Sequence, residues 1–176
     1  MKNILLLVVL VSGTLFGQEI PRLKLTPEGV APVVLTFDGL SASDIYSKSL
    51  EWVQETYNNP SEVLKANIKN KKIRIDGFKE KALSFRTVVL NEWGVSYTLE
   101  ISFKDEKCRF SYNINYFTGS DGSRTAITYK NFFRKNGEIR NSYISAVFSL
   151  NKSMNDLLIS YYNYVSGITD AENDDW

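Results

Sequence analysis

Hydrophobic and polar positions alternate with a period of two through the middle of the chain. With a turn centred on Asp105 and Glu106, the pairs that face each other on one side are Phe103/Cys108, Ile101/Phe110, Leu99/Tyr112 and Tyr97/Ile114. On the other side the pairs are Ser102/Arg109, Glu100/Ser111 and Thr98/Asn113. A slip of one residue would destroy this sorting, because successive strand residues point to opposite faces. The pattern predicts an antiparallel hairpin over residues 95–116 with one buried face.

Two segments have helical spacing instead. A stripe of Tyr46, Leu50, Val53 and Tyr57 follows a capping-box arrangement that starts at Ser41, and the Asn-Asn-Pro sequence at 58–60 ends it. From residue 141 onward apolar residues recur every three or four positions, and Gly167 is placed to end that helix. Whether the second helix continues through residues 151–153 is left open.

Weaker patterns suggest further strands and turns. Residues 32–37 read as a first strand, and residues 83–90 and 125–129 as later ones. A second hairpin around Asn70 and Lys71 would pair Ile68 with Ile73 and Ala66 with Ile75. The Asn-Gly pair at 136–137 indicates either a type I′ turn or the end of an element before the last helix.

The order of these elements is strand, helix, several antiparallel strands and a long helix. This order predicts an α+β fold, with a curved antiparallel sheet and two helices on one face. Each helix has a single apolar stripe and antiparallel sheets commonly leave one face in water, so both helices should cover the apolar face. Residues 32–167 would form one domain. Residues 18–31 read as an extended arm outside the core, and residues 168–176 as an acidic, disordered tail.

The amino terminus has the pattern of a secretory leader. Lys2 precedes an apolar run at residues 4–11, and Gly17 offers a small residue before Gln18. Eight apolar residues cannot cross about 30 Å of hydrocarbon, and no later run reaches transmembrane length. The sequence therefore predicts a signal peptide over residues 1–17, cleaved near Gly17/Gln18. The mature chain would be exported to the periplasm or secreted, with no transmembrane segment.

Composition excludes several chemistries. The chain has 21 basic and 20 acidic residues, and it has no clear basic excess of the kind that a nucleic-acid partner requires. The absence of histidine excludes Ser-His-Asp and Cys-His catalysis as well as histidine-ligated zinc. The single cysteine, Cys108, excludes an intramolecular disulfide and thiolate zinc clusters, and the hairpin pattern buries it. We expect no cofactor and no metal.

Several segments carry a family resemblance. They are Val34–Ser41 running into the helix with Trp52, Ile73–Phe78, Tyr97–Ile101, Cys108–Tyr112 and the tyrosine-rich last helix. The chain resembles a family of exported proteins of unknown function, common in Bacteroidota-type bacteria, with a TATA-binding-protein-like (TBP-like) fold. The resemblance covers about residues 30–167 and implies the β-α-β(n)-α order of that fold. It supplies no active-site residues, and the name of the fold does not imply DNA binding.

The polar side of the central hairpin is a candidate ligand surface. Its residues are Thr98, Glu100, Ser102, Arg109, Ser111, Asn113 and Asn115. Their hydroxyl, amide and charged groups could hydrogen-bond a sugar or a peptide, with Phe117 or Trp93 as an apolar platform at the end. The alternative is the wet face of an ordinary sheet, in which Glu100 and Arg109 form a diagonal ion pair.

Three other segments have candidate chemistry. Residues 65–81 hold seven basic side chains, which could contact phosphorylated glycans or lipid headgroups, or could protect a sheet edge from pairing. Ser149 and Lys152 fit an S-x-x-K motif of acyl-transfer enzymes, but the companion motifs are missing. The acidic tail lacks the oxygen spacing of a calcium loop.

Three kinds of function remain open. The first, which we favour, is a non-catalytic ligand-binding or interaction module of the cell envelope, whose partner is a glycan, a lipid headgroup or a peptide. The second is a histidine-independent hydrolase that uses carboxylate and lysine groups, such as Glu100 with Asp38 or Ser149 with Lys152. The third is a structural assembly protein that adds a strand at a sheet edge.

Overall fold

The structure, a computed structural model, describes residues 19–86 and 90–168. The predicted leader and residues 169–176 of the predicted acidic tail lie outside the described residues. The elements are β1 (Leu25–Thr26), β2 (Gly29–Val30), β3 (Val33–Thr36), α1 (Ala42–Thr56), α2 (Pro60–Val63), β4 (Leu64–Ile68), β5 (Lys72–Arg86), β6 (Leu90–Lys104), β7 (Lys107–Thr118) and α3 (Ile144–Ser166). Two short 3-10 helices, Tyr129–Phe132 and Asn141–Tyr143, lie between β7 and α3.

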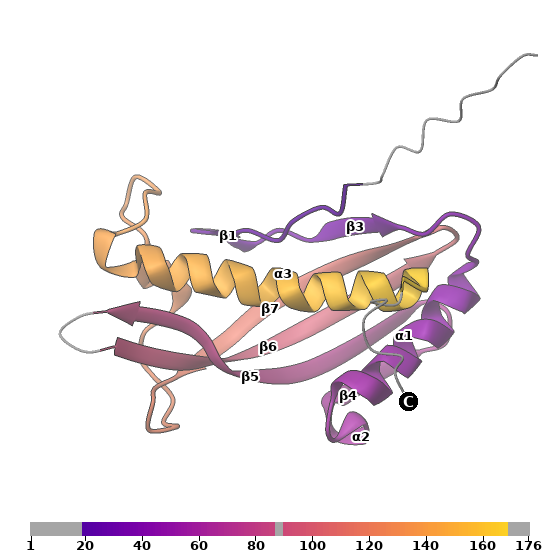
Figure 1. The fold of residues 1–176 in the computed structure, drawn as a ribbon, viewed down its shortest axis with the longest axis horizontal. Coiled ribbons are helices and arrows are strands. Elements are labelled where there is room, and N and C mark those ends of the chain that lie inside the picture. The colour runs from indigo at the N-terminus through magenta and orange to yellow at the C-terminus, as the bar shows by residue number, and fades with distance from the viewer. Residues whose placement is uncertain (1–18, 87–89, 169–176) are drawn as a thin grey trace, which may run out of the picture.

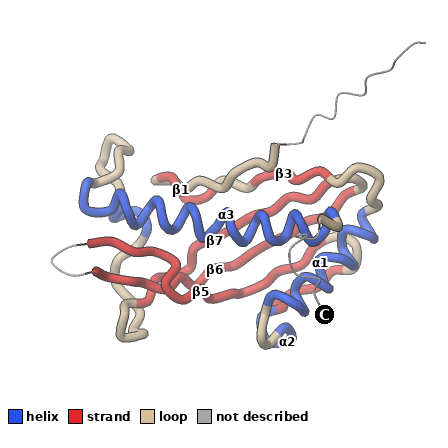
Figure 2. Tube along the Cα trace, viewed as in Figure 1, coloured by secondary structure: helices blue, strands red, loops and turns tan. Residues whose placement is uncertain are grey.

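Five antiparallel strands form the main sheet, in the order β3-β7-β6-β5-β4 (Figures 1 and 2). At its centre lies the hairpin of β6 and β7, in which every predicted pair occurs, from Phe103/Cys108 at the turn to Tyr97/Ile114. The long strands curve beneath the helices (Figure 1). The predicted α+β class with a curved antiparallel sheet is therefore confirmed.

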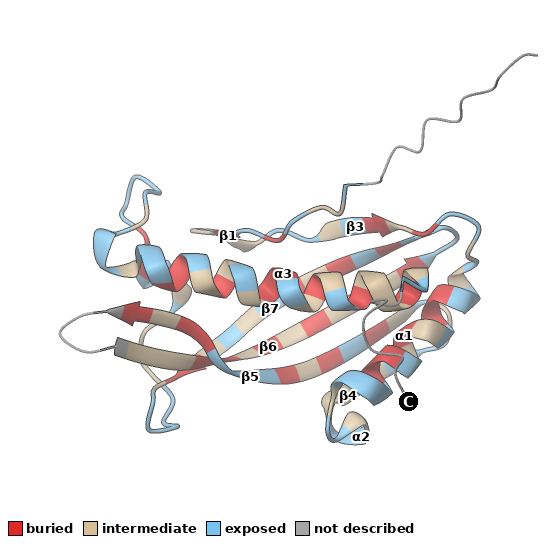
Figure 3. Ribbon diagram, viewed as in Figure 1, coloured by how far each residue is buried: buried red, intermediate tan, exposed pale blue. Residues whose placement is uncertain are grey.

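Helices α1 and α3 pack on one face of this sheet and against each other (Figure 1). Burial alternates along the central strands (Figure 3), and their buried residues belong to the same core cluster as the buried residues of α1 and α3. Four hydrogen bonds join the helices, and two of them, from Lys48 to the Val165 carbonyl and from Tyr164 to Glu55, are each 3.0 Å long. The hydroxyls of Ser49 and Tyr161 lie 2.8 Å apart, and the Trp52 indole donates to the Ser160 hydroxyl at 3.2 Å. Both helices thus cover the apolar face, as predicted.

Local capping explains where α1 begins. The backbone N–H of Asp44 donates to the Ser41 hydroxyl at 3.2 Å, and the Asp44 carboxylate accepts from the backbone N–H of Ser41 at 3.1 Å. The helix ends at Thr56, just before the predicted Asn-Asn-Pro stop. The short helix α2 was not predicted: Pro60 ends one helix but also opens the next, because the first turn of a helix does not need its N–H.

The amino-terminal arm contradicts its prediction in one respect, because it contributes to the core. Leu23 and Leu25 are each only 2% exposed and lie against α3. The amide of Asn155 holds Leu23 from both sides, accepting from its N–H at 2.9 Å and donating to its carbonyl at 2.8 Å. Asn151 accepts from the N–H of Leu25 at 2.8 Å. The prolines and glycine that suggested a peripheral segment shape its backbone, while its alternating leucines fill the core.

The second hairpin exists, but its predicted register is wrong by one residue. The structure pairs Ile68 with Lys72 around a three-residue turn in which Asn70 has a positive φ of 57°. Ile68 therefore points away from the helices and is 53% exposed, instead of facing the buried Ile73. Part of the predicted strand at 83–90 is the end of β5, which continues past a bulge to Arg86.

The segment between β7 and α3 is built from turns, and the predicted strand at 125–129 is wrong. Arg124 makes an isolated bridge with Thr118, and a 3-10 helix already begins at Tyr129. Ile127 and Tyr129 still pack against the core, which explains their alternation.

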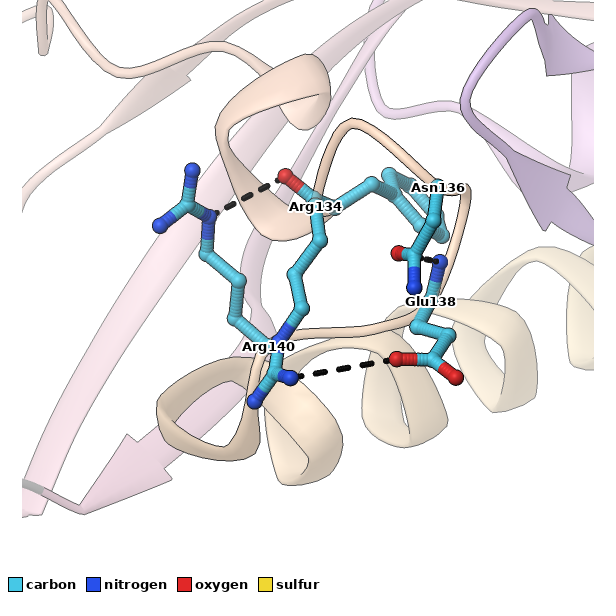
Figure 4. Close-up of polar contacts among 5 residues, drawn as sticks. Arg134, Asn136, Glu138 and Arg140 are labelled. Carbon is cyan, nitrogen blue, oxygen red and sulfur yellow. Dashed lines mark hydrogen bonds and ion pairs between the residues drawn. The ribbon is translucent and has the colours of Figure 1, made fainter.

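The Asn-Gly pair lies in a tight turn of this segment (Figure 4). The N–H of Gly137 donates to the Arg134 carbonyl at 3.0 Å, and the N–H of Arg134 donates to the Glu138 carbonyl at 2.8 Å. The guanidinium of Arg140 donates to the carbonyl of Phe133 at 3.0 Å (Figure 4). Asn136 has no positive φ, so the turn is not of type I′.

Candidate functional site

The seven predicted surface residues lie together on the side of the sheet opposite to the two long helices. We call this side the open face. It consists of Thr98, Glu100, Ser102, Arg109, Ser111, Asn113 and Asn115, together with Val34, Ala66, Ile68, Lys72, Arg74, Asp76, Phe78, Ser96, Lys104, Lys107 and Tyr116. The sequence predicts the central residues of the open face, on β6 and β7, but not those on the flanking strands β3, β4 and β5. The sequence does not show that β5 lies beside β6, which is what places Lys72 and Arg74 next to Glu100.

Strand pairing carries the open face across all five strands. In one row, Arg109 pairs with Val34 on one side and with Ser102 on the other, and the row continues through Lys72 to Ile68. Neighbouring strands lie about 4.8 Å apart, so this row is about 19 Å long. Its two ends, Val34 and Ile68, are apolar and about half exposed, whereas its centre is polar and basic.

The open face carries five basic side chains against two acidic ones. The basic residues are Lys72, Arg74, Lys104, Lys107 and Arg109, and the acidic residues are Asp76 and Glu100. Lys72 lies with its Nζ 2.8 Å from Oε2 of Glu100. This pair replaces the predicted pair of Glu100 with Arg109, because β5 brings a lysine to the other side of Glu100. Within residues 19–86 and 90–168, no carboxylate forms an ion pair with the other four basic residues.

A chain of hydrogen bonds fixes the polar side chains farther along the open face. The Thr98 hydroxyl donates to Oδ1 of Asp76 at 2.7 Å, and the Asn115 amide donates to the Thr98 hydroxyl at 3.1 Å. These contacts join β5, β6 and β7 side by side. They preorganise an acceptor, a hydroxyl and an amide, so a ligand would meet groups whose positions are already set.

The predicted apolar platform is wrong. Phe117 is fully buried and stacks on Phe132, with ring centroids 5.4 Å apart. Trp93 packs edge-on against Phe85 on the covered face, with ring centroids 4.8 Å apart. Neither ring reaches the open face.

For Phe117 the reason is a bulge of one residue in β7, whereas Trp93 follows the regular alternation of β6. Ser96 pairs with Tyr116 but Tyr97 pairs with Ile114, so Asn115 is an extra residue in β7. One extra residue reverses the alternation of inward and outward side chains, which turns Phe117 inward. The aromatic ring that does lie on the open face is Phe78, which is 49% exposed.

The candidate catalytic pair of Ser149 and Lys152 is engaged elsewhere. The Ser149 hydroxyl donates to the Ser145 carbonyl at 2.8 Å and accepts from the backbone N–H of Ser84 at 2.9 Å. The Lys152 ammonium lies 2.7 Å from a carboxylate oxygen of Asp156. Ser149 therefore satisfies an outward N–H of the β5 edge instead of facing a lysine base.

Glu100 and Asp38 are also far apart. Asp38 follows β3, whose last pair is Thr36 with Lys107, while Glu100 pairs with Ser111. At about 3.3 Å per residue, these two pairs lie roughly 13 Å apart along the strands. That separation exceeds the one at which two carboxylates act on one glycosidic bond.

The edges of the sheet are protected against pairing with a strand of another chain. Both edge strands are short, with four residues in β3 and five in β4. Beyond β4 the outer edge of β5 is interrupted by a bulge and carries Lys79 and Lys81, which discourages pairing with another chain.

Among residues 19–86 and 90–168, no three His, Cys, Asp or Glu side chains come together.

Cys108 lies under the helices and is 1% exposed, as its place in the hairpin predicted. Burial raises the pKa of its thiol to about 12. The Tyr161 hydroxyl donates to its sulfur at 3.5 Å. A thiol that stays protonated and covered is a core residue and not a nucleophile.

Residues 33–117 match the family described as "Domain of unknown function (DUF4468) with TBP-like fold". This part of the chain belongs to the DUF4468 family. The match includes the five-stranded sheet and α1, which confirms the resemblance and the TBP-like fold expected from it. Comparison with curated proteins finds no match.

Two crystal structures share the fold. One is a DUF4468 family protein from Bacteroides ovatus, with a TM-score of 0.62 and 16% identity over 77% of this chain and 85% of that chain. The other is a TBP-like protein from Parabacteroides distasonis, with a TM-score of 0.56 and 13% identity over 77% and 90% of the two chains. At these identities the likeness to both shows the fold alone. In the described part of this chain, no helix has the length and hydrophobicity to span a bilayer.

Proposed function

We propose that this DUF4468 protein is an exported, non-catalytic binding module of the cell envelope, whose open face holds an acidic glycan. The observation that carries the proposal is the set of basic side chains without acidic partners. Arg74, Lys104, Lys107 and Arg109 form no ion pair with any described carboxylate. They flank hydroxyl groups of the same face. A chain of sugar acids presents the complementary pattern, in which carboxylates alternate with hydroxyls.

The shape of the open face favours a glycan over a peptide or a lipid headgroup. A peptide that adds a strand needs a free backbone edge, and the edges here are short or protected. A membrane contact needs apolar side chains gathered in one patch, whereas Val34 and Ile68 lie at opposite ends of their row. Phe78 adds an exposed ring at the far end, against which the C–H face of a sugar can pack.

The positions of the candidate catalytic side chains support a binding role over a catalytic one. Ser149 and Lys152 each have another partner, and Glu100 is paired with Lys72. Export is compatible with the fold, because cleavage near Gly17/Gln18 keeps every residue that the structure describes. Intact-mass measurement of the protein from its own host should give a chain that begins near Gln18, and a retained Met1 would contradict export.

The test of the binding role compares two versions of one ligand. Isothermal titration would measure the affinity of the mature protein for a hexameric oligogalacturonate and for the same hexamer with its carboxyl groups methyl-esterified. A hydrogen bond to a charged group contributes about 1.5–3 kcal/mol, so we expect esterification to weaken binding at least tenfold. Raising the salt concentration should weaken binding of the acidic hexamer as well.

Two double variants distinguish a loss of binding at the open face from an effect of the protein's total charge. Arg74→Gln with Arg109→Gln should weaken the acidic hexamer at least tenfold. Lys130→Gln with Lys135→Gln removes the same charge from exposed positions between β7 and α3, and should leave the affinity unchanged. Equal affinity for both hexamers, or an equal loss in both variants, would overturn the proposal. Equally tight binding of hexaglutamate would reject the glycan in favour of an acidic peptide.

A further inference from the structure

A cavity lies on the covered side of the sheet, between α3 and β5, with a volume of about 430 Å³. We call it the α3–β5 cavity. Lys79, Lys81 and Ala82 line it from β5, Tyr97 and Tyr112 from the sheet, and Lys152 and Leu157 from α3. A volume of this size is typical of small-molecule sites.

A bulge in β5 opens this cavity. Lys79 pairs with Val95 and Leu83 with Trp93, so three residues of β5 lie opposite Gly94 alone. Lys81, in the middle of the bulge, has a positive φ of 49°. A bulge bends its strand, so β5 carries Lys79 and Lys81 to the rim of the cavity.

Helix α3 is anchored on both sides of the cavity. At one end the Ser149 hydroxyl accepts from the N–H of Ser84, and at the other the Ser160 hydroxyl accepts from the Trp52 indole. These two positions are about 16 Å apart along the helix, at 1.5 Å per residue. The helix therefore bridges the cavity between fixed points and cannot settle into it.

The sheet side of the cavity is aromatic and has hydroxyl donors. Tyr97 and Tyr112 stack with ring centroids 4.8 Å apart, and the Tyr97 hydroxyl lies 3.1 Å from that of Tyr57. Among the described residues, none hydrogen-bonds the Tyr112 hydroxyl. Burial, with the neighbouring tyrosine, raises the pKa of Tyr112 well above its ordinary value. Tyr112 thus keeps its proton at neutral pH, as a donor to an anion.

The rim is positively charged. Of its three lysines, Lys152 is neutralised by Asp156 at 2.7 Å, and Lys81 lies 3.1 Å from Glu92. Lys79 forms no ion pair with any residue in the described part of the chain. Stacked rings, a free hydroxyl donor and an unpaired ammonium therefore surround one space.

We propose that the α3–β5 cavity binds a small carboxylate with an apolar body. The carboxylate accepts from the Tyr112 hydroxyl and pairs with the Lys79 ammonium. The apolar body lies against the tyrosine rings, Ala82 and Leu157. This site is separate from the open face, so either one can fail without the other.

Octanoate, with octanol as its uncharged match, is the probe for this site. Isothermal titration should show saturable binding of octanoate at neutral pH, and binding at least tenfold weaker for octanol. Lys79→Gln and Tyr112→Phe should each weaken octanoate about fivefold to tenfold and leave octanol unchanged. Ser153→Trp, which places a large ring at the cavity wall, should abolish binding of both.

Lys69→Gln is the matched control, because it removes an equal charge from an exposed position of the β4–β5 turn. It should bind octanoate like the native protein, as should the double variant of Arg74 and Arg109 on the open face. Thermal melts identify any variant that does not fold, and Lys79→Gln alters only an exposed side chain. Absence of saturable binding, equal affinity for octanol, or no effect of Lys79→Gln would each overturn the proposal.

Discussion

Gly77 and Gly94 lie on neighbouring strands, and each is covered by an aromatic ring. A Cβ on Gly77 would lie 2.4 Å from Cζ of Tyr97, and a Cβ on Gly94 would lie 2.5 Å from Cζ of Phe78. The two rings differ in freedom. Tyr97 is 4% exposed and stacked on another ring, whereas Phe78 is about half exposed and can move into solvent.

We therefore expect Gly77→Ala to be the more damaging substitution. Overpacking of a filled core costs about 1–3 kcal/mol, and Gly77→Ala should lower the free energy of unfolding by that amount. Gly94→Ala serves as the matched control and should cost less, because Phe78 can move into solvent and the Thr118 hydroxyl, which would lie 2.6 Å from the new Cβ, can turn to another rotamer. Urea denaturation of both variants measures the difference, and equal losses would show that Tyr97 is not held in place.

Single residues also show where prediction from sequence succeeds. Cys108 and Tyr112 were placed correctly because strict alternation leaves one choice of face. Phe117 was misplaced because a bulge of one residue leaves no mark in the hydrophobic pattern. Ile68 was misplaced because an apolar side chain was assumed to face the core, whereas it lies at an exposed end of the sheet.

At the scale of elements, the amino-terminal arm is held by α3 through Asn155. Asn155→Ala removes both hydrogen bonds to Leu23 and leaves a buried N–H and a buried carbonyl without partners. Each such group costs about 1–3 kcal/mol. We expect the substitution to lower stability within that range or above it. The Leu23 amide should lose its protection in hydrogen exchange.

Asn151→Ala is the matched control for this prediction, because it removes one hydrogen bond, to the N–H of Leu25. It should free the Leu25 amide and leave Leu23 protected. If the Leu23 amide stayed protected in Asn155→Ala, the arm would be held by its leucines alone.

Long elements were predictable and short ones were not. Most of the stripe of α3 follows from the sequence, because about six turns of apolar spacing outweigh the polar residues at 151–153, through which the helix is continuous; Ile144, at its first turn, is exposed. Helix α2 and the strands β1 and β2 have two to four residues each, too few for any period to show. Their places depend on tertiary contacts, which a single sequence does not display.

At the scale of the whole molecule, buried tyrosines make stability depend on alkaline pH. Burial raises the pKa of Tyr57, Tyr97, Tyr112 and Tyr161. In the unfolded chain these groups ionise near pH 10. Their contribution is therefore complete below about pH 10 and is lost as the pH rises toward the folded pKa values, because the unfolded state releases protons first.

The free energy of unfolding should fall as the pH rises above about 10, with each buried tyrosine adding a slope of up to about 1.4 kcal/mol per pH unit. Urea denaturation across this range measures the slope. Tyr161→Phe removes one such group and should give a shallower slope than the native protein. Identical slopes would mean that Tyr161 ionises freely in the folded state.

The sequence predicts only part of the candidate site. Seven residues of the open face follow from one hairpin, because its register is fixed by polarity on both sides. Lys72, Arg74 and Val34 could not be added, since nothing in a single sequence says which strands flank that hairpin. The α3–β5 cavity is formed by the bulge in β5 and by a helix about seventy residues later in the chain, so no local sequence pattern predicts it.

The clamp between Leu23 and Asn155 joins residues 132 positions apart. Synthesis from the amino terminus therefore produces the arm long before the helix that holds it. Until Asn155 has been made, the N–H and the carbonyl of Leu23 lack the partner that they have in the folded protein, and α3 does not yet cover its part of the sheet. This part of the core therefore forms late, after β5, β6 and β7 have been made.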